Sequence, residues 1–218
     1  MAMDPVPLAV ALGPLALYML YLAGINLLRR PVLVSGAMNS AAVALSVSGF
    51  VVVGPMGLLL PEGAVNVFGA WVWLLMLGFY GLSVTLCILL SRPRLVIFNL
   101  SAEQLRPVLA EVVAKLDSEV RWAGDSLMLP HLGLQFHLEP YSPMRSLSLV
   151  SIGDRQSFAG WQRLEKDLRV ALRQTEVSPN PRGFSFLTCG LLLLSWPIYL
   201  TIKDGTAVAQ ALREMFRM

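Results

Sequence analysis

Long apolar stretches dominate this chain and are separated by one segment of mixed character. Four windows of mostly apolar residues cover residues 6–28, 41–60, 67–90 and 184–202, and none contains Lys, Arg, Asp, Glu or His. A helix needs about 20 such residues to cross the hydrocarbon core of a bilayer. The pattern therefore predicts a membrane α-helical bundle of four transmembrane helices, three within residues 1–94 and one after an inserted segment.

The inserted segment, residues 95–180, begins with the pattern of a strand followed by a helix. Residues 95–98 form a short apolar run rich in β-branched and aromatic side chains, which indicates a buried strand. Ser101 is suited to cap the next helix, and Gln104 stands three residues further on, as in a capping box. Pro107 either kinks this helix or lies in its first turn. The apolar stripe of the helix consists of Leu105, Leu109, Val112 and Leu116.

Beyond this helix the apolar period changes to two, which is typical of strands with one buried face. Strands are expected near residues 120–123, 127–129, 132–139 and 146–149. Gly124-Asp125 is expected to form the hairpin turn between the first two. A last amphipathic helix begins near Ser157, and its apolar side consists of Phe158, Trp161, Leu164, Leu168 and Leu172. Residues 95–180 are therefore predicted to form a small α+β domain, an antiparallel sheet with two helices on one face.

The composition agrees with a membrane protein. Of the 218 residues, 56% are hydrophobic and only 14% are charged, whereas an ordinary soluble domain has about 25% charged residues. Twelve of the 17 basic residues and ten of the 14 acidic ones lie between Arg92 and Arg182. The net charge of +3 is modest, and no basic cluster is interleaved with aromatic residues. We therefore expect a lipid bilayer, and no nucleic acid, as the partner of this chain.

Basic residues beside the apolar windows predict the orientation. Arg29 and Arg30 follow the first window, and Arg92 and Arg94 follow the third. Because such residues collect on the cytoplasmic side, we expect the N-terminus outside and the α+β domain in the cytoplasm, in a plasma membrane or cell inner membrane. Residues 205–218 have the pattern of an amphipathic C-terminal helix, whose basic residues disagree with the outside position that four spans would give it.

Two surfaces of the predicted helices are candidates for contacts. Ser40, Ala44 and Ser48 recur at every fourth position, and small residues at that spacing let helices approach closely in lipid. Their contact is either within this chain's own bundle or between copies of the chain. The last helix of the inserted domain has a basic side, which either contacts anionic lipid headgroups or is merely solvated. The basic residues of that side are Arg163, Lys166, Arg169 and Arg173.

Candidate catalytic chemistry is sparse. His137 and Glu139 share the polar face of one predicted strand, and His131 is near them in the sequence, so they are weak candidates for an acid–base pair. Two histidines without a third ligand at a suitable spacing do not predict a metal site. The chain has no Gly-x-Ser-x-Gly elbow and no phosphate-binding glycine loop, so no cofactor is predicted.

These observations favour a function without catalysis. The leading interpretation is an accessory or scaffold subunit whose cytoplasmic α+β domain binds a membrane or cytoplasmic protein partner. One alternative is a membrane-bound enzyme that uses His137 and Glu139 on a lipid-derived substrate. The other is a small transporter or channel subunit, whose aqueous path would need polar residues such as Asn26 and Asn39.

Overall fold

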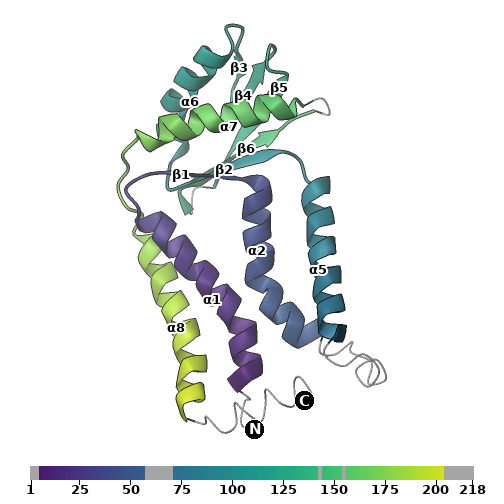
Figure 1. The fold of residues 1–218 in the computed structure, drawn as a ribbon. Helices are drawn as coiled ribbons and strands as arrows, with labels where there is room; N and C mark the ends of the chain where they lie inside the picture. The colour runs from purple at the N-terminus through teal and green to yellow at the C-terminus, as the bar shows by residue number, and fades with distance from the viewer. Residues whose placement is uncertain (1–4, 57–70, 142–143, 154–155, 204–218) are drawn as a thin grey trace. The chain divides into compact units, whose positions relative to one another are not determined.

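The computed structural model of the chain describes residues 5–56, 71–141, 144–153 and 156–203. It divides into two compact units (Figure 1). The helical unit consists of Met1–Leu22, Ser40–Leu90 and Ser185–Met218, and the sheet unit consists of Ala23–Asn39 and Ser91–Phe184. The C-terminal helix predicted at residues 205–218 lies outside the described residues.

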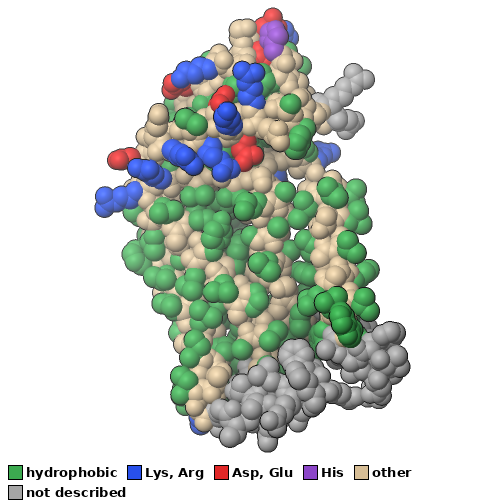
Figure 2. Space-filling view, viewed as in Figure 1, with side chains coloured by type: hydrophobic (Ala, Val, Ile, Leu, Met, Phe, Trp, Pro, Cys, Tyr) green, Lys and Arg blue, Asp and Glu red, His purple; other side chains and the backbone are tan. Residues whose placement is uncertain are grey.

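The part of the chain that the structure describes contains four apolar helices, as the sequence predicts, and each is long and apolar enough to cross a membrane. Their bounds are α1 at Pro5–Leu27, α2 at Gly36–Val51, α5 at Trp71–Leu90 and α8 at Arg182–Lys203. A short π-helical segment, Val52–Met56, continues α2. Hydrophobic side chains cover most of the visible surface of these helices, whereas the charged ones lie mainly over the sheet unit (Figure 2).

Glycines and one tyrosine hold the four apolar helices together. A Cβ atom added at Gly49 of α2 would lie 2.0 Å from the backbone oxygen of Val10 on α1, so only glycine allows this approach. The hydroxyl of Tyr80 on α5 donates a hydrogen bond of 2.7 Å to the backbone oxygen of Ala44 on α2. Gly190 of α8 similarly faces Leu20 of α1, at 2.9 Å from an added Cβ.

The described residues of the sheet unit form six strands in the order β1-β2-β6-β5-β4-β3, and every neighbouring pair is antiparallel. The hairpin predicted at Gly124-Asp125 is confirmed, because it joins β3 and β4, with Gly124 at φ 62°. The bounds are Val32–Ser35 for β1, Arg94–Phe98 for β2, Arg121–Ala123 for β3, Ser126–Leu129 for β4, Leu134–Tyr141 for β5 and Ser146–Ser151 for β6.

Strand β1 has no counterpart among the predicted strands. It lies between the first two apolar helices and pairs with β2, with Leu33 opposite Ile97. The sheet unit therefore takes in Ala23–Asn39 in addition to the inserted segment. Because the Ser35 hydroxyl accepts a hydrogen bond of 3.3 Å from the backbone N–H of Met38, α2 begins directly after this strand. That start lies five residues before the predicted one.

Helices α6 (Ala102–Leu116) and α7 (Phe158–Arg173) cover one face of the sheet (Figure 1). The capping box of α6 is confirmed: the Ser101 hydroxyl accepts from the Gln104 N–H, and the Gln104 side chain accepts from the Ser101 N–H. Pro107 lies beyond the first turn of α6. The prediction for Phe158 was wrong, because this first residue of α7 is 76% exposed.

The core lies between these two helices and the sheet. Phe136 of β5 and Trp161 of α7 meet there, with ring centroids 5.7 Å apart. The core takes side chains from both helices and from five of the strands, β1 included. Its fully buried members include Ile97, Leu105, Leu109, Leu129, Phe136, Leu149, Leu164 and Leu168.

Candidate functional site

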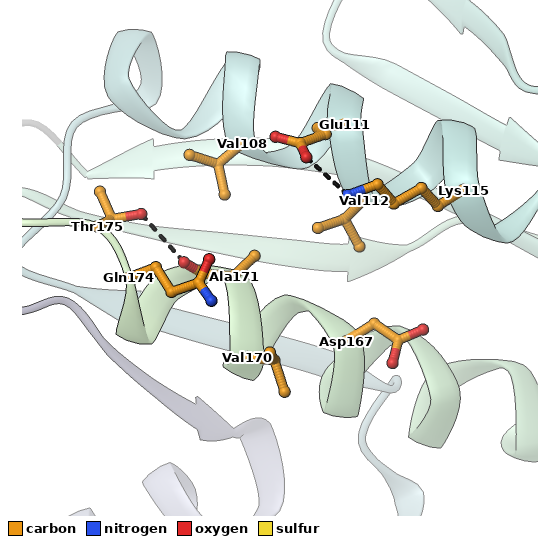
Figure 3. A pocket seen from close by; sticks show the side chains of 9 residues that line it. All are labelled: Val108, Glu111, Val112, Lys115, Asp167, Val170, Ala171, Gln174 and Thr175. Carbon is orange, nitrogen blue, oxygen red and sulfur yellow. Dashed lines mark hydrogen bonds and ion pairs between the residues drawn. The ribbon is translucent and has the colours of Figure 1, made fainter.

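An open groove of about 490 Å³ lies between α6 and α7, on the side of the sheet unit that carries the helices (Figure 3). Its volume falls within the range of about 300–1,000 Å³ that is usual for ligand sites. Both helices that form it are capped at their start, α6 by Ser101 and α7 by Ser157, whose hydroxyl accepts from the Gly160 N–H at 3.1 Å. The lining residues are Val108, Glu111, Val112, Lys115, Asp167, Val170, Ala171, Gln174 and Thr175.

The groove has a mixed lining, in which apolar side chains lie beside the uncharged polar Gln174 and Thr175 and a charged rim. Val108 and Val112 of α6 and Ala171 of α7 point into the space between the two helices (Figure 3). Val170 also lines the groove, and its 55% exposure leaves a branched apolar side chain open to a ligand. Buried apolar contacts of this kind are what give a docking surface most of its affinity.

The rim is asymmetric in charge. Lys115 and Glu111 of α6 neutralise each other through an ion pair of 2.7 Å. Asp167 of α7 is half-buried and forms no ion pair with any residue that the structure describes. The rim therefore presents one uncompensated negative charge beside an apolar surface.

The predicted pair of His137 and Glu139 lies on the other face of the sheet. Nε2 of His137 and Oε1 of Glu139 are 2.7 Å apart. Opposite them on the neighbouring strand β6 are Val150 and Ser148. Nδ1 of His137 is buried and has no hydrogen-bond partner in the described part of the chain. The two side chains thus meet, but neither of them lines the groove.

The other residues singled out from the sequence are dispersed. Ser40, Ala44 and Ser48 are half-buried on one side of α2, where Ala44 accepts the hydrogen bond of Tyr80. The basic residues of α7 are all exposed, and Arg169 forms an ion pair of 2.6 Å with Glu165. A contact between copies of the chain through Ser40, Ala44 and Ser48 stays a prediction. So does a contact with lipid headgroups through the basic residues of α7, which are Arg163, Lys166, Arg169 and Arg173.

A buried polar junction joins the end of α1 to the start of α8 within the sheet unit. The Asn180 side-chain amide donates to Oδ1 of Asn26 at 2.9 Å, and the Asn180 backbone N–H donates to the Asn26 backbone oxygen at 2.8 Å. Both asparagines are 2% exposed. The backbone N–H of Val177 donates to the backbone oxygen of Arg29 at 2.9 Å. Carbonyl groups at a helix end need such partners when they are buried, and the loop before α8 supplies them.

Asn99, at the end of β2, extends this junction. Its side-chain amide donates to the backbone oxygen of Leu28 at 2.7 Å, and the residue is fully buried. Its backbone has φ 60°, a conformation that asparagine tolerates better than most residues. Arg145, with φ 46°, donates from Nη1 to the backbone oxygen of Ser178 at 3.2 Å. These bonds and those of Asn180 connect four segments that are distant in the sequence: the end of α1, the residue after β2, the residue before β6 and the loop before α8.

Asp117 and His131 form a second polar contact, at the end of α6. Oδ1 of Asp117 lies 2.7 Å from Nδ1 of His131, and its Oδ2 accepts from the His131 backbone N–H at 2.8 Å. Burial alone would raise the pKa of the Asp117 carboxyl, but hydrogen bonds from His131 and Glu119 outweigh burial and lower that pKa. The hydrogen bond to Asp117 raises the pKa of His131, and the negative charge of the Asp117 carboxylate raises it further. This pair joins α6 to the turn before β5.

Comparison with protein-family models, curated proteins and solved structures finds no match for this chain. Among the described residues, no three or more His, Cys, Asp or Glu side chains gather in an arrangement that could hold a metal ion.

Sequence reasoning did not identify the groove or the polar junction. The groove needs α6 and α7 side by side, although about forty residues separate them in the chain. Asn26 does stand out as a polar residue at the end of an apolar window, but its partner Asn180 is 154 positions away. The apolar stripes of α6 and α7 indicated that each helix packs on the sheet, but not that the two lie side by side.

Proposed function

We propose that this chain is a membrane-anchored scaffold or accessory subunit whose α+β domain binds a protein partner in the groove between α6 and α7. The observation that carries the proposal is the open groove itself, which has valine and alanine side chains in its lining and is bordered by Asp167, a carboxylate without an ion pair among the described residues. Four apolar helices suited to a bilayer would hold the domain at the membrane surface.

The proposed occupant is an amphipathic helix of the partner. A helix can place apolar side chains at i, i+3, i+4 and i+7 along such a groove, where Val108, Val112 and Val170 would receive them. A Lys or Arg on the same helix would complement Asp167 and set the register. The Glu111–Lys115 pair is already neutral and adds polar contacts at the rim.

Site-specific photocrosslinking in native membranes tests this surface. A photoreactive residue in place of Val170, which is 55% exposed, reports contacts in the groove. One in place of Met128, which is 44% exposed on β4 outside the groove, reports contacts elsewhere. We expect a discrete crosslinked protein from position 170 and none from position 128. A partner captured equally from both positions, or only from position 128, would contradict the groove.

A charge reversal makes the test specific. Asp167→Lys should lower the yield of the Val170 crosslink several-fold, since it replaces attraction of a basic partner with repulsion. Glu103→Lys makes the same change of charge on α6 at a residue that does not line the groove. In this control variant the yield of the crosslink from position 170 should stay unchanged. If the yield of this crosslink is also unchanged in Asp167→Lys, the proposed register of the partner helix is wrong.

We also propose the orientation that the sequence predicts, with the N-terminus outside and the α+β domain in the cytoplasm. Arg29, Arg30, Arg92 and Arg94 all belong to the sheet unit, at the ends of α1 and α5, and they support this orientation through the positive-inside rule. Reporter fusions within the inserted domain test it. A reporter active outside the cytoplasm would reverse the orientation.

The 2.7 Å contact between His137 and Glu139 supports a second candidate function, a membrane-bound enzyme acting on a lipid-derived substrate. The Glu139 side chain, which is 58% exposed, would exchange protons with the substrate, and its hydrogen bond to Nε2 of His137 would hold it in place. The test is turnover of a fluorogenic phospholipid by the reconstituted full chain. Turnover that His137→Gln abolishes would favour the enzyme, whereas no turnover, or equal turnover by the variant, would exclude this activity on that substrate.

A further inference from the structure

Three arginines flank the place where the end of α1 meets the start of α8. Arg29 and Arg30 follow within three residues of Leu27, the last residue of α1, and Arg182 is the first residue of α8. All three side chains are exposed. We call Arg29, Arg30 and Arg182 the junction arginines. They are brought together by tertiary structure, because more than 150 residues of chain separate the first two from the third.

The polar junction includes the backbone of two of these residues, Arg29 and Arg182. The Arg29 backbone oxygen accepts from the Val177 N–H at 2.9 Å, and the Arg182 N–H donates to Oδ1 of Asn180 at 3.2 Å. Asn180 is itself bonded to Asn26, the last residue but one of α1. A Cβ added at Gly183 would lie 2.8 Å from Cγ of Leu27, so the first turn of α8 lies directly against the end of α1.

The charge of the junction arginines is not compensated within the described part of the chain. None of the three forms an ion pair there. The nearest acidic residue along the loop before α8 is Glu176, which is exposed and also makes no ion pair. Three exposed arginines without an ion pair among the described residues, on segments joined by hydrogen bonds, make a surface that favours an anion.

We infer that the junction arginines bind the phosphate of an anionic phospholipid headgroup. The inference rests on α1 and α8 crossing a membrane and is independent of the partner proposed for the groove. Arg30 is three residues from the end of α1, a stretch of at most about 11 Å, so its guanidinium reaches the headgroup layer beside the hydrocarbon core. Arginine suits this ligand, because its planar fork of N–H donors matches two phosphate oxygens.

Lipid binding to the purified full chain tests the inference. Native mass spectrometry measures how tightly the chain retains phosphatidylglycerol, which is anionic, and phosphatidylcholine, which has no net charge. We expect a clear preference for phosphatidylglycerol. Arg29→Gln with Arg182→Gln should weaken that binding about 25-fold, since each basic residue near a membrane surface contributes about five-fold. Equal retention of the two lipids by the natural chain would overturn the inference.

A matched control separates this site from general attraction to positive charge. Arg106→Gln with Arg121→Gln removes the same charge from exposed residues of α6 and β3, and the affinity for phosphatidylglycerol should remain within about two-fold of that of the natural chain. An equal loss in both double variants would contradict a site at the junction. Arg29→Lys with Arg182→Lys keeps the charge but loses the planar fork, and should retain only part of the selectivity.

Two further measurements distinguish the ligand and do not depend on the folding of the glutamine variants. Inorganic phosphate should displace phosphatidylglycerol poorly; displacement at equal concentration would show that the site binds free phosphate rather than a lipid. Raising the salt concentration from about 0.1 M to about 1 M shortens the Debye length to about a third. The preference for phosphatidylglycerol should therefore decrease. A preference that does not depend on salt would overturn the electrostatic basis of the site.

Discussion

The side-chain amide of Asn180 lies 2.9 Å from Oδ1 of Asn26, and this hydrogen bond joins the end of the first apolar helix to the loop before the last. A second bond, from the backbone N–H of Asn180 to the backbone oxygen of Asn26, runs beside it at 2.8 Å. Both residues are almost fully buried, and the contact joins the last residues of α1 to the loop before α8 within the sheet unit.

Breaking this contact should destabilise the protein. Asn180→Ala leaves the buried Oδ1 of Asn26 without this partner, and an unpaired buried polar group costs about 1–3 kcal/mol. Asn26→Ala should cost a similar amount, measured by thermal or denaturant unfolding of the full chain in detergent micelles. In the double variant the two losses should not add, because each removes the same hydrogen bond. Full additivity would show that the two side chains do not interact.

The pair of Asp117 and His131 should make stability depend on pH at both ends of a window. The pKa of His131 is raised from 6.5, so its contribution is complete below pH 6.5 and is lost as the pH rises through the raised value. The pKa of Asp117 is lowered from 3.8, so its contribution is present above pH 3.8 and is lost as the pH falls through the lowered value.

NMR titration checks the histidine half of this prediction. The chain has only two histidines, and His137→Gln identifies the His131 signal. We expect a pKa for His131 above 6.5 and a lower pKa in Asp117→Asn, which removes the negative charge. A pKa for His131 that does not change in Asp117→Asn would contradict the contact.

A side chain at position 49 should destabilise the protein, whereas one at position 13 should be tolerated. A Cβ at Gly49 would lie 2.0 Å from the Val10 oxygen, so Gly49→Ala must push α1 and α2 apart, at about 1–3 kcal/mol, as overpacking does. Nothing lies within 4 Å of a Cβ at Gly13 in the middle of α1. Gly13→Ala should therefore be neutral or slightly stabilising, because alanine favours a helix. Unfolding of the two variants in micelles compares them directly, and equal stability would exclude the close α1–α2 packing.

Leu33 and Leu28 provide a test of the added strand β1. Leu33 is 7% exposed and belongs to the core beneath α6 and α7, whereas Leu28 is 50% exposed. Leu33→Ala should cost about 2–5 kcal/mol, as is usual for a buried leucine. Leu28→Ala should cost about 0.5 kcal/mol or less, as an exposed substitution does. A small loss in both variants would mean that residues 32–35 are a simple connection rather than part of the sheet.

Local patterns in the sequence were sufficient for most individual elements of this fold. The four apolar helices, the capping box at Ser101 and the hairpin at Gly124-Asp125 follow from the composition or spacing of neighbouring residues. Phe158 shows the limit of such reasoning. It fits the apolar stripe of α7, yet it precedes the part of the helix that packs on the sheet and is exposed.

The candidate sites were less predictable, since each joins residues from distant parts of the chain. His137 and Glu139 are two positions apart on one strand, and their contact could be expected from the alternation of side chains. The groove depends on how closely α6 and α7 pack, which the stripes of the two helices do not specify. The junction arginines depend on the hydrogen bonds of Asn180.

By itself, the sequence determined the four apolar helices and an antiparallel sheet with two helices, because hydrophobic length and periodicity are properties of neighbouring residues. Tertiary structure alone decided that the connection after α1 supplies the edge strand β1, since a run of four residues becomes a strand only when β2 pairs with it. It likewise decided that Asn26 and Asn180 meet. The physical reason is the same in both cases: a hydrogen bond between distant segments depends on how the chain packs, and no local pattern encodes it.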